Sequence, residues 1–234
     1  MTPRRLCLAP LILLGLLGCG PSVVSLGYRP AQSLAPVGPA TVGVYRLVDS
    51  RPGWPARSPA RTVAIIAAEL PITYNVHAEA DREVGAFVAE AIRSELGASG
   101  LKVAGGAEYN RAVGPEGANA VRAARADRAV LGRINYFGWI QPGFAGLLFQ
   151  SGMPTGKVFV DLDLWVVAPS TGEVLWAGSV REKKDSGDSW SKKSEELSPL
   201  LADTLRAGLT RLAKRKDFAW AVSGVAAAPV AVAP

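Results

Sequence analysis

Apolar residues alternate with polar or small residues along several short segments of the chain. An alternation with a period of two is typical of β-strands that bury one face. The pattern predicts strands at residues 41–48, 61–67, 101–104 and 129–140, with a further extended stretch at 72–76.

The clearest pair of strands lies at residues 157–167 and 173–184, on either side of the turn sequence Pro-Ser-Thr-Gly. Two alternating runs around such a turn predict a β-hairpin. We expect Val167 to pair with Glu173, so that the apolar residues of both strands share one face. On the return strand the apolar set is Val174, Trp176 and Val180. The opposite face then brings together Asp161, Asp163, Ser179 and Arg181.

Three other segments have apolar residues spaced by three and four positions, which predicts helices at 80–98, 116–126 and 194–216. Gly97 and Gly100 mark the end of the first helix. The last helix carries a stripe of leucines at positions 197, 200, 201, 205, 209 and 212. The order of these elements predicts the α/β (α+β) class, with a single mixed β-sheet and amphipathic helices packed mainly on one face.

The N-terminus has the features of an export signal. Two arginines precede an apolar run over residues 6–17, which is too short to span a bilayer as a helix, and the run ends in Leu-Leu-Gly-Cys19. This ending resembles the bacterial lipobox. The resemblance implies that Cys19 becomes the first residue of the mature protein and carries acyl chains; the alternative is an ordinary secretory signal with an incidental cysteine.

Composition divides the chain into four parts. Residues 1–18 are the expected lipoprotein signal peptide, and the proline-rich segment 19–40 is expected to be the lipidated N-terminus and a flexible tether. Residues 41–218 are expected to form a single α/β domain. Residues 219–234 are almost entirely Ala, Val and Pro, and we expect a low-complexity tail; the alternative is an Ala-rich helix up to Pro229.

The net charge and the cysteine content argue against nucleic-acid binding and against a metal site. Removal of the signal takes away Arg4 and Arg5 and no acid, so the charge of the mature chain is (26 − 2) − 20 = +4. An exported, weakly basic domain is not expected to bind nucleic acid. Cys7 leaves with the signal and one histidine remains, so we expect no metal site and no cofactor.

Several segments together resemble the YajG-like bacterial lipoproteins and the wider CsgG-like group of envelope lipoproteins. They are residues 42–51, the 84–101 segment, Ala-Asp-Arg-Ala-Val-Leu-Gly-Arg-Ile at 126–134, and the 160–176 hairpin with Thr-Gly-Glu-Val-Leu-Trp. The resemblance spans about residues 40–215. It implies a cell-envelope protein, since members of that group are often components of secretion or assembly machines.

The uncharged segment 136–154 is the first candidate site. It joins two predicted strands, where polar residues are usual, and its large apolar residues predict a surface for partner proteins or self-association. These residues are Phe144, Leu147, Leu148, Phe149 and Met153. Two alternatives remain open, namely a loop folded over the sheet and a loop that dips into the membrane interface.

The second candidate site is Asp49 and Arg51, an acid and a guanidinium at the end of a strand, which could bind a carboxylate or phosphate ligand. The alternative is a turn cap and a local ion pair. Asp161 and Asp163 could serve acid–base chemistry, but their cationic neighbours predict an ion ladder instead. His77 could belong to a catalytic triad; the alternative is a histidine in a loop or at the N-terminal end of the 80–98 helix.

These observations predict a lipoprotein at the periplasmic face of the outer membrane, acting without catalysis as an accessory or assembly component of an envelope complex. One alternative is a carrier that holds a lipid or a small amphiphile between sheet and helix. Another is a hydrolase with carboxylate chemistry.

Overall fold

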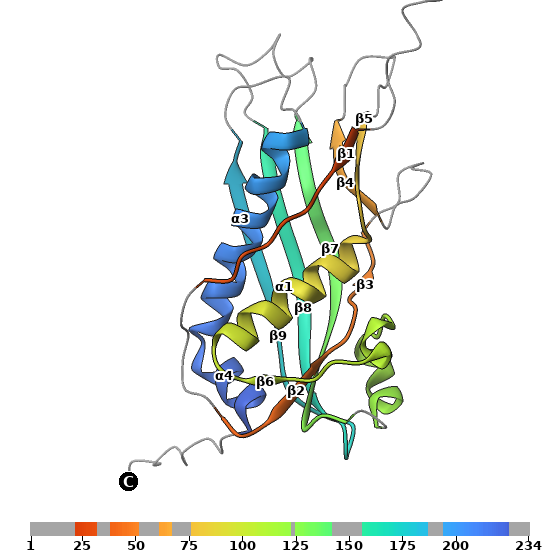
Figure 1. Ribbon diagram of the computed structural model, residues 1–234, viewed down its shortest axis with the longest axis vertical. Coiled ribbons are helices and arrows are strands. Elements are labelled where there is room, and N and C mark those ends of the chain that lie inside the picture. Colours follow the sequence, from red (N-terminus) through yellow and green to blue (C-terminus); the bar gives the residue numbers. More distant parts are fainter. Residues whose placement is uncertain are drawn as a thin grey trace, which may run out of the picture.

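The computed structural model describes residues 22–31, 38–51, 61–66, 76–122, 125–141, 156–186 and 194–224 (Figure 1). It has the mixed α/β architecture predicted from the sequence, with helices laid across one face of a mixed β-sheet. The strands are β1 (Ser22–Val24), β2 (Thr41–Val44), β3 (Val48–Asp49), β4 (Thr62–Ile66), β5 (Val76–Ala80), β6 (Lys102–Val103), β7 (Arg128–Gln141), β8 (Lys157–Ala168) and β9 (Glu173–Asp185). The helices are α1 (Val84–Ala98), α3 (Ser194–Ala213) and α4 (Lys216–Ser223), with 3₁₀ helices η3 (Ala107–Asn110) and η4 (Pro115–Val121).

The long strand β7 organises the sheet. Along one side it pairs with β8 in antiparallel fashion, and β8 pairs with β9. Along its other side it pairs in succession with β2, β3 and β4, all parallel. β6 extends the sheet beyond β2, and β5 followed by β1 extends it beyond β4.

The predicted hairpin is confirmed, with a different register near its turn. Val167 pairs with Val174 instead of Glu173, and an irregularity between Val166 and Val167 shifts the strands once more. Because of these shifts Val174 does not join the apolar face and is 47% exposed, whereas Trp176 and Val180 are buried as expected.

The predicted helix at 116–126 is wrong in type, because the described part of it is the 3₁₀ helix η4. Its sequence, Pro-Glu-Gly-Ala-Asn-Ala-Val, includes a glycine and an asparagine, which are poor formers of an α-helix. The helix predicted at 194–216 divides into α3 and α4, with a turn at Lys214.

The main core lies between the sheet and helices α1, α3 and α4. Most of the leucine stripe is confirmed: five of the six residues, all but Leu200, are buried. The α1 helix contributes Phe87, Val88 and Ile92, and the sheet contributes alternate residues of β7 and β8. Among the described residues, no helix is both long and apolar enough to cross a membrane.

A second, smaller core lies on the opposite face of the sheet, at the end where β7 begins. The 3₁₀ helices cover it, and the Tyr45 and Tyr109 rings meet edge to face with centroids 5.1 Å apart. Its other members are Val113, Val121, Ala129, Leu131 and Val167. Among the described residues, helices α1, α3 and α4 cover one face of the sheet, and the 3₁₀ helices cover this end of the other face.

The N-terminal strap, residues 22–31, departs from the expected tether. Its β1 strand pairs with β5, and Val24 and Leu26 are 1% and 3% exposed. Glu95 of α1, itself 4% exposed, accepts hydrogen bonds from the Tyr28 hydroxyl and from the Ala31 amide. The strap is short and contains Gly27 and Pro30, so its sequence has no clear strand signal.

The predicted tail also starts later than expected. Residues 219–223 belong to α4, where Val222 is buried and the Ser223 carbonyl accepts a hydrogen bond from the Ala40 amide. The remainder, 225–234, lies outside the described residues.

Candidate functional site

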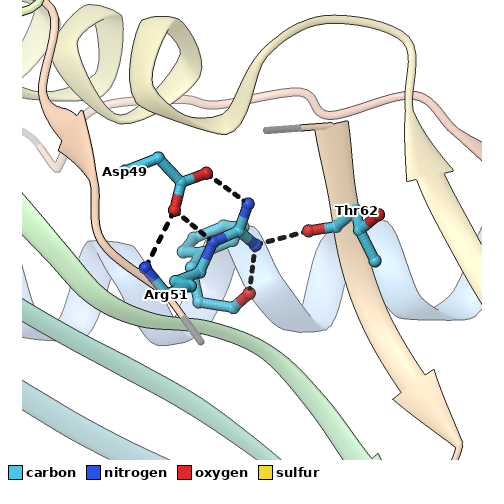
Figure 2. A network of polar contacts seen from close by, with 4 residues as sticks. Asp49, Arg51 and Thr62 are labelled. Carbon is cyan, nitrogen blue, oxygen red and sulfur yellow. Dashed lines mark hydrogen bonds and ion pairs between the residues drawn. The ribbon is translucent and has the colours of Figure 1, made fainter. Parts of the chain in front are cut away.

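Asp49 and Arg51 form a compact network at the end of β3 (Figure 2). The Arg51 Nε donates to Asp49 Oδ1 at 2.8 Å and Nη2 donates to Oδ2 at 2.6 Å, so the two planar groups meet as a fork. The Arg51 Nη1 donates to two carbonyl oxygens, that of Phe137 at 2.9 Å and that of Thr62. The side chains of Arg51 and Asp49 are 11% and 19% exposed.

This network fills a discontinuity in the sheet. β3 pairs with β7 at Arg133 and Ile134, and β4 pairs with β7 from Trp139 onward. Between these two stretches the guanidinium of Arg51 supplies the hydrogen bond to the Phe137 carbonyl that a neighbouring strand would otherwise supply. Arg51 therefore joins β3, β4 and β7.

Ligand binding by Asp49 and Arg51 stays a prediction, and the geometry favours the local ion pair. The guanidinium directs four hydrogen bonds to protein oxygens. A phosphate or carboxylate ligand would have to displace acceptors that are fixed by the sheet itself. The pair is best explained as part of the fold.

Replacement of this arginine is expected to destabilise the domain. Arg51→Met removes the guanidinium that donates to the Asp49 carboxylate and to the Thr62 and Phe137 carbonyl oxygens, and keeps only the backbone amide of residue 51 as a donor to Asp49. We expect this to cost about 2–4 kcal/mol in the free energy of unfolding. Urea unfolding followed by circular dichroism measures this difference. Arg181→Met is the matched control, because the Arg181 side chain is 71% exposed and its loss should cost at most about 1 kcal/mol. Equal losses in the two variants would contradict the structural role of Arg51.

A second candidate site is the part of the sheet that neither helices nor 3₁₀ helices cover. We call it the open face and define it by outward-facing residues of β7, β8 and β9. These are Tyr136, Phe159, Asp161, Asp163, Arg181 and Lys183. Several of them line an open hollow of about 450 Å³ together with Val160 and Glu182.

The open face combines aromatic and charged groups. The Tyr136 and Phe159 rings meet edge to face with centroids 5.7 Å apart, and the Lys183 ammonium lies 5.8 Å from the Phe159 centroid. Burial raises the pKa of Tyr136 to about 12, although the nearby Arg51 guanidinium opposes the shift. The phenol is therefore neutral at physiological pH and can donate a hydrogen bond.

The two aspartates of the open face lie in an ion and hydrogen-bond ladder. Asp161 pairs across the strands with Arg181 at 3.5 Å, and Asp163 pairs with Ser179. Asn135, at the irregularity in β7, donates to Asp163 at 2.7 Å and to Asp161 at 3.4 Å. The predicted meeting of these aspartates with Ser179 and Arg181 is confirmed.

The other candidate chemistry finds no support within the described ranges. The backbone of His77 lies in β5, and its side chain lies outside what the structure describes. No group of three His, Cys, Asp or Glu side chains in the described part of the chain could hold a metal ion.

Two of the predicted sites fall outside the described residues. One is Cys19, and the other is the apolar set Phe144, Leu147, Leu148, Phe149 and Met153. Both stay predictions. The structure fixes only the flanks of the second one, since β7 ends at Gln141 and β8 begins at Lys157 at the same end of the sheet.

The space in which a carrier would hold a lipid is filled by side chains. Phe87, Phe137, Leu162, Leu201 and Leu205 are each at most 2% exposed and belong to one continuous core between sheet and helices. The carrier interpretation therefore has no supporting observation among the described residues.

The open face was not predicted as a candidate site from the sequence. Its signal was present, because Phe159, Asp161 and Asp163 alternate with buried residues of β8. What the alternation could not show is that helices cover only one side of this part of the sheet.

Comparison with known proteins supports the fold. No family model matches the chain, and no curated protein matches it either. A crystal structure of a Xanthomonas campestris protein designated DUF330 is similar, with a TM-score of 0.52 and 13% sequence identity over 87% of this chain and 96% of that one. A lipoprotein from Neisseria meningitidis gives a TM-score of 0.41 at 15% identity, over 76% of this chain and all (100%) of that one. The PelC dodecamer from Paraburkholderia phytofirmans gives 0.39 at 15% identity, over 80% and 97%.

Sequence identities this low indicate a shared fold and nothing more. Of the three TM-scores, that of the DUF330 protein exceeds 0.5. The resemblance to YajG-like and CsgG-like lipoproteins stays a prediction. The chain shares the fold of the DUF330 protein.

Proposed function

We propose that the protein is a lipid-anchored component of the bacterial cell envelope. Acyl chains on Cys19 hold it at the periplasmic face of the outer membrane, and its domain acts by recognition, as an accessory or assembly component without catalysis. The lipobox-like sequence at Cys19 supports the anchor. Envelope proteins or further copies of this chain are the expected partners.

The observation that carries the recognition role is the open face. Aromatic rings, a lysine and a partly exposed ion pair lie together on a rigid three-stranded surface. Aromatic and arginine side chains are those that contribute most to protein–protein contacts. The face of the described sheet opposite to it packs against α1, α3 and α4.

Site-specific photo-cross-linking in intact cells tests this role. A photoreactive phenylalanine analogue at position 159 or 183 of the lipidated protein should give discrete adducts. The same analogue at the exposed position 207 of α3 serves as the matched control and should give few. Arg181→Glu, which reverses a charge on the open face, should weaken the adducts at 159.

The outcome separates the alternatives. Discrete adducts at 159 and 183 that are lost in the Arg181→Glu variant support recognition by the open face. Similar yields at 159, 183 and 207, or no adducts at the first two, would show that the open face does not engage a partner.

A further inference from the structure

The chain enters the fold at one end of the sheet. The row of paired residues that starts at the first residue of β1 can be followed across all the long strands. It runs through Ser22, Ala78, Ala64, Trp139, Val158 and Lys184. β7 and β9 end, and β8 begins, within two residues of this row, at the end that is uppermost in Figure 1.

Very little chain separates this row from the anchor residue. Gly20 and Pro21 lie between Cys19 and Ser22. Three extended residues span at most about 11 Å, because a fully extended chain advances about 3.6 Å per residue. If Cys19 is acylated, the upper end of the sheet therefore lies within about one helix diameter of the bilayer surface.

The N-terminal strap is held against the domain, so it does not give the domain the freedom of movement that a free tether would. Val24 and Leu26 are buried, and α1 holds the strap at Tyr28 and Ala31 through the buried Glu95. Arg82 donates to the Leu26 carbonyl at 2.9 Å. The point at which the chain becomes fixed to the domain is therefore β1, and not the start of β2 at Thr41.

The side chains near this row suit a lipid surface. Val23 of β1 is 59% exposed, the most exposed of the large apolar side chains among the described residues. At the ends of β8 and β9, Lys157 and Lys184 lie beside Asp185, and the Lys184 ammonium is 4.0 Å from a carboxylate oxygen of Asp203 on α3. Three strands, β5, β4 and β7, separate Val23 from these lysines, so this end of the sheet has an exposed apolar side chain at one edge and basic side chains toward the other. Both kinds of side chain favour the headgroup region of an anionic bilayer.

We propose that this anchor end, comprising Val23, Lys157 and Lys184, rests on the bilayer surface and fixes the orientation of the domain. The strands then stand away from the membrane, and the β8–β9 turn at residues 169–172 is the most distant part of the hairpin. The inference rests on the proposed lipidation of Cys19 and adds the surface by which the domain meets the lipid. In this orientation the open face looks along the membrane, toward neighbours anchored in the same leaflet.

Depth-dependent fluorescence quenching tests the orientation. The mature sequence has no cysteine besides Cys19, so Lys184→Cys and Thr171→Cys each introduce a single thiol for a fluorescent label. The two positions lie about 40 Å apart along the hairpin, because each strand residue adds about 3.3 Å. In vesicles of phosphatidylethanolamine and phosphatidylglycerol with nitroxide on a fraction of the headgroups, the lipidated protein should lose most of its fluorescence at position 184 and none at 171.

A tether insertion provides the matched control. A Gly/Ser insert of about 20 residues between Pro21 and Ser22 has an end-to-end distance of roughly 25 Å, and it should abolish quenching at position 184 without preventing vesicle binding. Binding without a difference between positions 184 and 171 would overturn the proposed orientation while leaving the anchor intact. Quenching at 184 that survives the insert would support contact of the anchor end with the lipid and would overturn the role of the short connection. Failure of the unlabelled, processed protein to bind vesicles at all would instead overturn the lipid anchor itself.

Discussion

Cys19→Ser is expected to move the protein from the membrane fraction to the soluble fraction and to abolish incorporation of labelled palmitate. A serine hydroxyl is a much weaker nucleophile than a thiol, so no diacylglyceryl group is transferred to this position. Each buried methylene contributes about 0.8 kcal/mol to membrane binding, and two or three chains together give stable anchoring. Cell fractionation with metabolic labelling measures both effects.

The control for this experiment lies within the same signal. Cys7→Ser changes a cysteine in the apolar run and should leave labelling and fractionation unchanged. A Cys19→Ser protein that is still processed, labelled and recovered with membranes would contradict the anchor and remove the basis for the proposed location.

Phe87→Ala is expected to give the largest loss of stability among single substitutions in the core. The Phe87 ring is fully buried at the point where the strap, α1 and the sheet meet. Its centroid lies 5.9 Å from that of Phe137 and 6.4 Å from that of Tyr28, both in edge-to-face geometry. Removal of a buried phenylalanine costs about 3–5 kcal/mol, and urea unfolding of the signal-free domain measures it.

Phe159→Ala is the matched control for this prediction. It removes the same side chain from the open face, where Phe159 is partly exposed and has one aromatic partner. The expected loss is about 1 kcal/mol. Comparable losses for the two variants would mean that the core does not depend on Phe87 as the packing indicates.

Local patterns were sufficient to predict much of the fold. The helix over α1, the leucine stripe of α3 and the hairpin of β8 and β9 each depend on side chains close together in the sequence. Such periodic signals are strong because every residue of the element repeats them. The register of the hairpin was the exception. Leu175 is an extra residue in β9 opposite Val166 and Val167, and one extra residue leaves the alternation intact on both sides.

Contacts between distant residues were not predictable in this way. Arg51 bonds to the Phe137 carbonyl, 86 positions away, and Tyr28 bonds to Glu95, 67 positions away. Both contacts depend on strand order, which the sequence pattern does not specify. For the same reason the segment at 22–31 was expected as a tether, and Asp49 with Arg51 as a ligand site.

The position of β7 in the sheet affects when the protein can fold during its synthesis. β2, β3 and β4 precede it in the chain, yet each of them pairs with β7. The first half of the polypeptide therefore cannot complete its hydrogen bonding until residue 141 has been synthesised. Contacts between distant segments slow folding, so the nascent chain stays unfolded for longer, as the proposed export of the polypeptide would require.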